Sequence, residues 1–150
     1  MKKTYHGSCH CGAVHFECDL DLSSDQHIEG FVGGTRRCNC SYCLKTRMWK
    51  AFALKGDFRL IEGADMLTDY RAANSNWPEG NIHHYFCSRC GVRGFSQGYL
   101  DFPPFDGEFH AVNVATLDDV TAEEFSAAPI IYEDGRNNVF DKPPPISSYL

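Results

Sequence analysis

Long apolar runs and an excess of positive charge are both missing from this sequence of 150 residues. No uninterrupted apolar segment approaches the roughly 18–20 residues that a membrane-spanning helix requires, which excludes such a helix. Fourteen lysines and arginines stand against 20 aspartates and glutamates, giving a formal net charge of −6. Binding to nucleic acid or to an anionic membrane needs a clustered positive surface, so the acidic balance argues against both kinds of partner.

Internal repeats, linkers and an apolar leader are also absent. Because no repeat or linker divides the chain, we expect one domain over residues 1–150 with one modest core. Lys2 and Lys3 follow Met1, but no apolar stretch follows them, unlike in a secretory signal. We therefore expect a reducing, cytoplasmic compartment, where clustered cysteines bind metal or do chemistry more often than they form disulfides. The alternative is a secreted disulfide scaffold whose signal has been removed.

Short segments of alternating polarity predict a mainly β fold with one or two short helices. Within residues 13–18, alternation places Val14, Phe16 and Cys18 on one face. Thr121-Ala122-Glu123-Glu124 has the form of a capping box and predicts the start of a helix. The expected strands cover residues 13–18, 48–54, 58–61, 67–71, 82–86 and 110–115, with a turn at 55–57 joining the second to the third.

What the sequence has in excess is cysteine and histidine, with eight of the first and seven of the second. In a C-x-x-C turn, two thiolates converge on one ion while nearby backbone N–H groups point at the sulfurs. Zinc prefers four tetrahedral thiolate or imidazole ligands, so seven clustered cysteines divide naturally into four and three. The seven fall into three motifs, Cys9-x-Cys11, Cys38-x-Cys40-x-x-Cys43 and Cys87-x-x-Cys90.

The two motifs that offer two ligands each are expected to share one closed, structural zinc site. Such a site would tie the N-terminal strand to a hairpin late in the chain, and structural zinc supplies roughly 10–16 kcal/mol of apparent binding free energy. The remaining motif offers three thiolates and leaves a fourth position open, as catalytic zinc sites do. The closed site consists of Cys9, Cys11, Cys87 and Cys90, and the open site of Cys38, Cys40 and Cys43.

An open zinc site with three thiolates suits a small thiol better than it suits hydrolysis. Three negative charges on a doubly charged ion make it a weak Lewis acid, which acidifies water less than a three-histidine site does. Sulfur ligands match such a soft centre, so a fourth thiolate is the expected ligand. Basic residues that flank the motif are candidates to contact an anionic substrate, and they are Arg36, Arg37, Lys45 and Arg47.

These motifs resemble the glutathione-dependent formaldehyde-activating enzyme family, which also contains centromere protein V. Order and spacing agree from residue 7 to about residue 95. Tyr132-Glu133-Asp134-Gly135-Arg136 also resembles a late segment common in that family. The segments that carry the resemblance are Gly7-Ser8-Cys9-His10-Cys11-Gly12-Ala13-Val14, Cys38-Asn39-Cys40-Ser41-Tyr42-Cys43 and Phe86-Cys87-Ser88-Arg89-Cys90-Gly91.

The resemblance implies a zinc-stapled, mainly β fold of the β-tent kind and the same division into a structural and a second zinc site. It also implies the condensation of formaldehyde with glutathione to S-(hydroxymethyl)glutathione, a carbon–sulfur lyase reaction in reverse. Many members of the family carry small residues directly after the third cysteine of the second motif. Here the chain reads Leu44-Lys45-Thr46-Arg47-Met48-Trp49 instead, a departure that concerns the substrate more than the metal.

Several other residues have simpler interpretations. Cys18, outside the three motifs, is interpreted as a buried, inert thiol rather than a ligand. His83 and His84 must face opposite ways in a strand, and a structural role is favoured over completion of the second zinc site or proton transfer. The aromatic residues Trp49, Phe52 and Phe58 are interpreted as core.

Two other classes of function compete with an enzyme that acts on a small thiol such as glutathione. The first is a non-catalytic, zinc-stabilised protein-binding module, whose second zinc would be completed by a histidine or by Cys18. The second is a redox thiol protein, which ranks last because the Cys87/Cys90 motif lacks a thioredoxin-like βαβ context.

Overall fold

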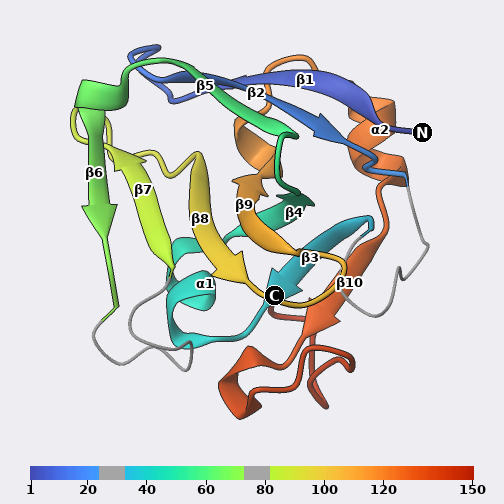
Figure 1. Ribbon diagram of the computed structural model, residues 1–150. Helices are drawn as coiled ribbons and strands as arrows, with labels where there is room; N and C mark the ends of the chain where they lie inside the picture. Colours follow the sequence, from blue (N-terminus) through green and yellow to red (C-terminus); the bar gives the residue numbers. More distant parts are fainter. Residues whose placement is uncertain (24–32, 73–81) are drawn as a thin grey trace.

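The computed structural model describes residues 1–23, 33–72 and 82–150, which form two β-sheets and two short α-helices (Figure 1). The strands are β1 (Lys3–Ser8), β2 (His15–Leu20), β3 (Thr35–Cys38), β4 (Trp49–Ala53), β5 (Phe58–Glu62), β6 (Leu67–Tyr70), β7 (His83–Cys87), β8 (Phe95–Leu100), β9 (Gly107–Asn113) and β10 (Ile130–Glu133). The α-helices are α1 (Ser41–Thr46) and α2 (Ala122–Ala127), and the 3₁₀ turns are η1 (Ala64–Met66), η3 (Val114–Thr116) and η4 (Gly135–Asn137).

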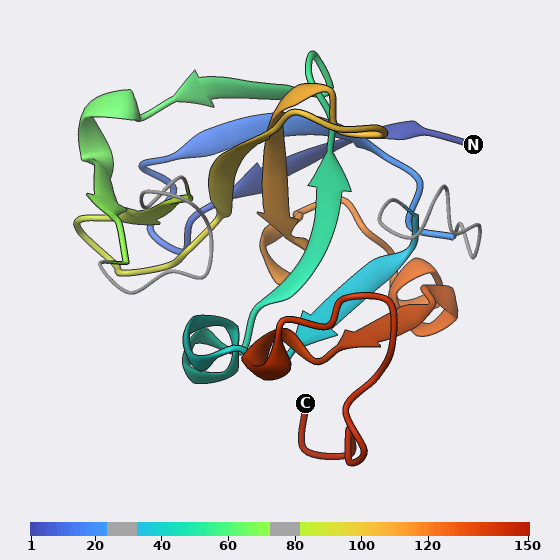
Figure 2. The ribbon, with the colours of Figure 1, turned by 60° about the horizontal axis from the view of Figure 1, so that its bottom comes forward.

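The two sheets differ in size and position. The smaller one has the antiparallel order β1-β2-β5, and the larger one has the order β10-β3-β4-β9-β8-β7-β6. Only the pairing of β10 with β3 is parallel among the described strands. The smaller sheet crosses the top of the view in Figure 1, over the strands of the larger sheet. Figure 2 shows α1 and the segment after β10 close together at the opposite end of the molecule.

The main core lies between the two sheets. The alternation predicted for residues 13–18, most of which form β2, is confirmed, because Val14, Phe16 and Cys18 are each at most 3% exposed. The Phe16 ring contacts Phe58 of β5 and Phe95 of β8, with ring centroids 5.5 and 5.6 Å apart. Aromatic rings from both sheets thus meet at one point, and burial of such rings supplies much of the hydrophobic stabilisation of a small core.

The turn predicted at residues 55–57 is present, but it does not make a hairpin. Gly56 has a positive φ of 85°, and the Asp57 N–H donates to the Leu54 carbonyl over 2.9 Å. The strands on either side pair with different partners, β4 with β3 and β9, and β5 with β2. The turn therefore carries the chain from the larger sheet to the smaller one, an outcome that alternation within each strand does not specify.

The prediction of a mainly β fold with one or two short helices is confirmed. The capping box at α2 is complete, since Thr121 Oγ1 accepts from the Glu124 N–H over 3.1 Å and Glu124 Oε2 accepts from the Thr121 N–H over 2.9 Å. Alternation did not reveal β1, β3, β8 or β10. Across the described part of the chain, no helix has the length and apolar character needed to cross a membrane.

Candidate metal centres and the adjoining cavity

The first cysteine cluster joins the two sheets. Cys9 and Cys11 lie in the turn between β1 and β2, and Cys87 and Cys90 lie at the turn between β7 and β8. The four Sγ atoms lie within 4.8 Å of one another, with 3.6 Å between Cys9 and Cys11 and 3.7 Å between Cys11 and Cys87. Tetrahedral zinc with Zn–S bonds of about 2.3 Å holds its sulfurs about 3.8 Å apart, so this geometry fits a closed four-thiolate site.

The two turns that supply these cysteines both end in a glycine with a positive φ. Gly12 and Gly91 follow the last cysteine of each motif, and both have a φ of 73°, a conformation that glycine adopts at little cost. The Gly12 N–H donates to the Cys9 carbonyl over 2.9 Å, and the Gly91 N–H donates to the Cys87 carbonyl over 2.8 Å. Hydrogen bonds from the backbone N–H groups of Val92 and Cys11 help lower the pKa of Cys90 to about 6. The turn at Cys87 and Cys90 thus favours the ionised form of the Cys90 sulfur, the form that metals bind.

The second cluster forms where β3 passes into α1. Cys38 ends the strand, Cys40 is the N-cap of the helix and Cys43 lies in its first turn. Their three Sγ atoms lie within 4.8 Å of one another, and no other cysteine, histidine or carboxylate in the described residues joins them. Cys38 Sγ accepts from the Cys40 N–H and Cys40 Sγ accepts from the Cys43 N–H, each over 3.4 Å. This is a three-ligand arrangement with one side open.

The segment after β10 packs directly on this cluster. Glu133 of β10 lies opposite Cys38 of β3 in the parallel register. Asn39 Nδ2 donates to Asp134 Oδ1 over 2.6 Å and so ties the two segments together. A Cβ atom added to Gly135 would lie only 2.4 Å from Cys38 Sγ. A residue without a side chain is therefore required where the late segment passes the cluster.

The open side of the three-cysteine cluster faces a cavity of about 280 Å³. Side chains from β4, β7, β8 and β9 form its walls together with α1 and the segment after β10. Besides the three cysteines, its walls include three basic residues, Lys50, Arg93 and Arg136.

A buried ion-pair chain stands in the cavity wall. Glu133 is 1% exposed, and its carboxylate lies 3.1 Å from Arg36 Nη1 and 2.8 Å from Lys50 Nζ. Burial lowers the pKa of Lys50, but the negative charges of Glu133, Cys43 and Cys38 outweigh that effect and raise it overall. The chain of two cations and one anion leaves a net positive charge next to the cysteine sulfurs.

Replacement of Glu133 by glutamine is expected to destabilise the fold, because it leaves two buried cations without their anion. Removal of one partner from a buried ion pair costs roughly 3–5 kcal/mol. The measurement is the urea midpoint of unfolding, with Glu123→Gln as the matched control on an exposed helical turn. Equal, small shifts for both variants would show that the ion-pair chain contributes nothing to folding.

A second polar group lines the cavity near α1. The Arg93 guanidinium donates to Ser96 Oγ over 2.5 Å, and its Nη2 lies 3.0 Å from His84 Nδ1. Burial and the charge of Arg93 lower the pKa of His84 to about 4, so its imidazole is neutral near pH 7. Because a guanidinium can only donate, Nδ1 of His84 accepts and its proton resides on Nε2. The Tyr42 and His84 rings stack with their centroids 4.0 Å apart, and Arg93 Cζ lies over the Tyr42 ring, 4.5 Å from its centroid.

The family model for the glutathione-dependent formaldehyde-activating enzyme matches residues 4–134. The chain belongs to this family. A protein of Halomonas elongata that bears the family's name is 34% identical over 88 residues, or 56% of this chain. That match spans about half of the relative, 50% of its length. The crystal structure of a Rhodobacter sphaeroides protein is similar with a TM-score of 0.58 and 30% identity, covering 84% of this chain and 99% of that chain.

Within this member of the family, none of the four basic residues predicted from the sequence lines the large cavity. Arg36 is buried in the ion pair with Glu133, and Arg37 stacks over the Trp49 ring at 5.4 Å. Lys45 and Arg47 are exposed on and after α1. Proximity in sequence to the three cysteines therefore did not place these four residues on the wall of the large cavity.

The basic residues that do line the cavity come from other elements. Lys50 belongs to β4, Arg93 precedes β8, and Arg136 lies in η4. The family resemblance pointed to the segment that contains Glu133 and Arg136, but no local pattern distinguished Lys50 or Arg93 from ordinary surface cations.

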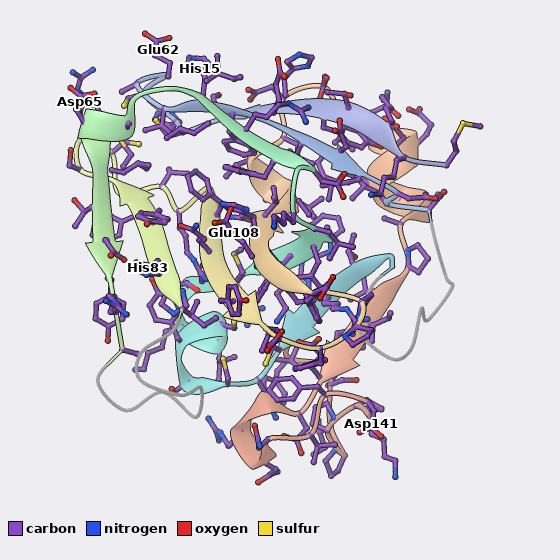
Figure 3. All side chains as sticks on the ribbon, in the orientation of Figure 1. His15, Glu62, Asp65, His83, Glu108 and Asp141 are labelled. Carbon is purple, nitrogen blue, oxygen red and sulfur yellow. The ribbon has the colours of Figure 1, made fainter. Side chains whose placement is uncertain are left out.

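Cys18, the two adjacent histidines and the three aromatic residues lie in different parts of the fold. Cys18 is fully buried in the main core, outside both clusters, and burial raises the pKa of its thiol to about 12. His83 and His84 face opposite ways, since His83 pairs with Asp69 of β6 over 2.7 Å while His84 lines the cavity. Figure 3 shows the position of His83 on β7. Trp49 and Phe58 pack against the main core as expected, whereas Phe52 lines the cavity.

Proposed function

We propose that this protein is a zinc-dependent enzyme that adds a small thiol, glutathione or a close analogue, to an aldehyde. In the reverse direction it would act as a carbon–sulfur lyase on the adduct. The observation that carries the proposal is the three-cysteine cluster with its open side on a cavity of about 280 Å³. Family membership supports glutathione and an aldehyde as the reactants.

Zinc is the ion that the two sulfur sets fit best. Four thiolates make a closed structural site at Cys9, Cys11, Cys87 and Cys90, and three make an open site at Cys38, Cys40 and Cys43. A zinc ion in the open site supplies a soft, positively charged position at which a substrate thiol stays ionised and nucleophilic.

The protein's own residues prepare the cavity for this reaction. Lys50 and Arg93 lie close enough to Cys43 for its charge to affect the pKa of each. Their positive charges offset the surplus negative charge that three thiolates and a substrate thiolate bring together. Arg136 adds a third cation on the wall, suited to a carboxylate of an anionic thiol such as glutathione.

The chemical step is an addition that balances without a redox partner. The thiol loses its proton, its sulfur forms a bond to the carbonyl carbon, and the carbonyl oxygen takes up one proton. The N–H donors of Lys50 and Arg93 stabilise negative charge that develops on that oxygen. Holding thiol and aldehyde side by side in one cavity contributes a proximity advantage to the rate.

We propose a cytoplasmic location for this activity. None of the eight cysteines forms a disulfide, and clustered cysteines without disulfides are typical of a reducing compartment. Glutathione is a thiol suited to such a compartment, where it stays in its reduced form.

Spectroscopy of the cobalt-substituted protein tests the open site. Millimolar glutathione is expected to change the ligand-field bands of the cobalt in the three-cysteine cluster and to leave those of the closed cluster unchanged. In Cys43→Ala, one metal ion per chain and the response to glutathione are expected to disappear together. Cys18→Ala, which removes a cysteine outside both clusters, is the matched control and should keep both. If glutathione leaves the cobalt bands of the wild type unchanged, the result would favour the non-catalytic protein-binding module.

A further inference from the structure

The end of the cavity away from the cysteines is apolar. Phe105 and Phe109 meet with their ring centroids 4.8 Å apart, and Phe52 meets each of them edge-to-face at 5.4 and 5.7 Å. Leu100 and Ile82 also belong to this second hydrophobic cluster, which is separate from the core between the sheets. All five residues line the same cavity as the three cysteines.

The strand register explains why one cavity has two chemically different ends. On β4, Lys50 and Phe52 share a face, so the first lies near the cysteines and the second near the aromatic cluster. His84 of β7 and Ile82, directly before β7, show the same arrangement, with His84 near the cysteines and Ile82 near the aromatic cluster. On both strands, the polar side chain therefore lies at the cysteine end of the cavity, and the apolar side chain two residues away lies at the other end.

Small residues on the neighbouring strands keep this space open. Ala111 of β9 lies between Phe52 and Ser96 in the register across β4, β9 and β8, strands that are side by side in Figure 1. One step along, Gly98 lies opposite Phe109, and a Cβ at Gly98 would lie 2.7 Å from the Phe109 ring. Ala111 and Ser96 thus give the cavity a floor of small side chains, and the absence of a side chain at Gly98 makes room for the Phe109 ring in the apolar wall.

Neither glutathione nor formaldehyde accounts for an apolar end. Glutathione is charged at both of its ends, and formaldehyde is a single carbon with no apolar part. Burying hydrocarbon favours binding by about fourfold for each methylene group, so an aromatic-lined space selects for a substrate that can fill it.

We infer that the aldehyde partner carries a hydrocarbon or aromatic substituent, which occupies the space bounded by Phe52, Phe105, Phe109, Leu100 and Ile82. This inference rests on the proposed function, because it assumes that the thiol sulfur lies at the three-cysteine cluster. The reaction stays an addition: the sulfur bonds to the carbonyl carbon, the substituent on that carbon points to the apolar end, and the oxygen takes up the proton. The product is a hemithioacetal with an apolar arm.

Stable thioethers test this inference without turnover. S-Methylglutathione and S-hexylglutathione have the same peptide and sulfur, and differ in the alkyl group attached where the aldehyde carbon would be. Isothermal titration of the zinc-loaded protein is expected to show at least tenfold tighter binding of the hexyl compound. In a rate assay with glutathione, hexanal is expected to exceed formaldehyde in kcat/KM relative to the uncatalysed reactions by a similar factor.

A variant in which a larger side chain partly fills the cavity tests the same inference. Ala111→Leu places a larger side chain on the floor between Phe52 and Ser96, and is expected to remove most of the preference for the hexyl compound. Ala115→Leu makes the same change at an exposed position outside the cavity and should keep the preference. Zinc content and circular dichroism show whether each variant is folded, and the wild-type comparison stands even if Ala111→Leu does not fold.

The outcomes separate the two proposals. Equal binding of both thioethers by a protein whose cobalt spectrum responds to glutathione would overturn the apolar-substrate inference and leave the proposed function standing. A hexyl preference that survives in a folded Ala111→Leu would also overturn it, since the alkyl group would then lie elsewhere. A cobalt spectrum that glutathione does not change, together with no binding of either thioether, would overturn both the proposed function and the apolar-substrate inference.

Discussion

Replacing Cys87 with alanine is expected to unfold the protein. The four-cysteine cluster is the point at which the turn between β1 and β2 meets the turn between β7 and β8, and so holds the smaller sheet on the larger one. Structural zinc supplies roughly 10–16 kcal/mol of apparent binding free energy, whereas a whole domain is stable by only about 5–15 kcal/mol. Loss of one of four ligands therefore removes a contribution comparable to the total stability.

Circular dichroism, a urea titration and zinc analysis of purified Cys87→Ala measure this effect. We expect no cooperative unfolding transition, and we expect a strong chelator to produce the same loss of structure in the wild type. Cys43→Ala is the comparison from the open cluster and should retain a cooperative transition with one zinc ion per chain. Collapse of both variants alike would contradict the division into a structural and an open site.

Replacing Gly135 with alanine is expected to empty the three-cysteine site and abolish activity while the fold persists. Gly135 does not have a positive φ, so its backbone accepts an alanine, but the new Cβ would lie 2.4 Å from Cys38 Sγ and 3.1 Å from Cys40 Cβ. Cys38 is 4% exposed and cannot move away without leaving its place in the cluster. Changes to groups that support metal ligands weaken metal affinity by about 10- to 100-fold, and a direct clash with a ligand belongs at the upper end.

Zinc per chain, and the glutathione response of the cobalt protein, are the measurements for Gly135→Ala. Gly56→Ala is the control, because Gly56 has a φ of 85° but nothing within 4 Å of an added Cβ. That variant is expected to lose about 1 kcal/mol of stability through backbone strain and to keep both metal ions. Two zinc ions per chain and an unchanged glutathione response in Gly135→Ala would contradict this prediction. They would show that the segment after β10 shifts to accept the new Cβ without disturbing the three-cysteine cluster.

The sequence was a good guide wherever the relevant interactions are local. The buried face with Val14, Phe16 and Cys18, at and just before β2, and the capping box of α2 follow from spacing alone, and the structure has both. The spacing of each short motif also gives the number of sulfurs that it offers, and the preference of zinc for four ligands then predicts the grouping of the seven clustered cysteines into four and three, which the structure has. Whether zinc fills the two clusters remains a prediction.

The surroundings of the open cluster could not be predicted in the same way. Arg36 was a candidate substrate contact by its position before Cys38, but Glu133, 97 residues further along, holds it in a buried pair. Lys50 and Arg93 reach the cavity only because β4 and β8 flank β9 in the larger sheet. Charge in a sequence indicates which residues are available, and the pairing of distant strands decides which of them meet.

The sequence by itself determined the two sulfur sets, the mainly β character and the membership of a family, since each depends on residue types at short, regular spacing. Only the tertiary structure decided that β4 and β5 belong to different sheets, that Gly135 passes against Cys38, and that Phe52 faces a cavity rather than the main core. The physical reason is that strand register and sheet assignment depend on contacts between residues far apart in the chain, which no local pattern records.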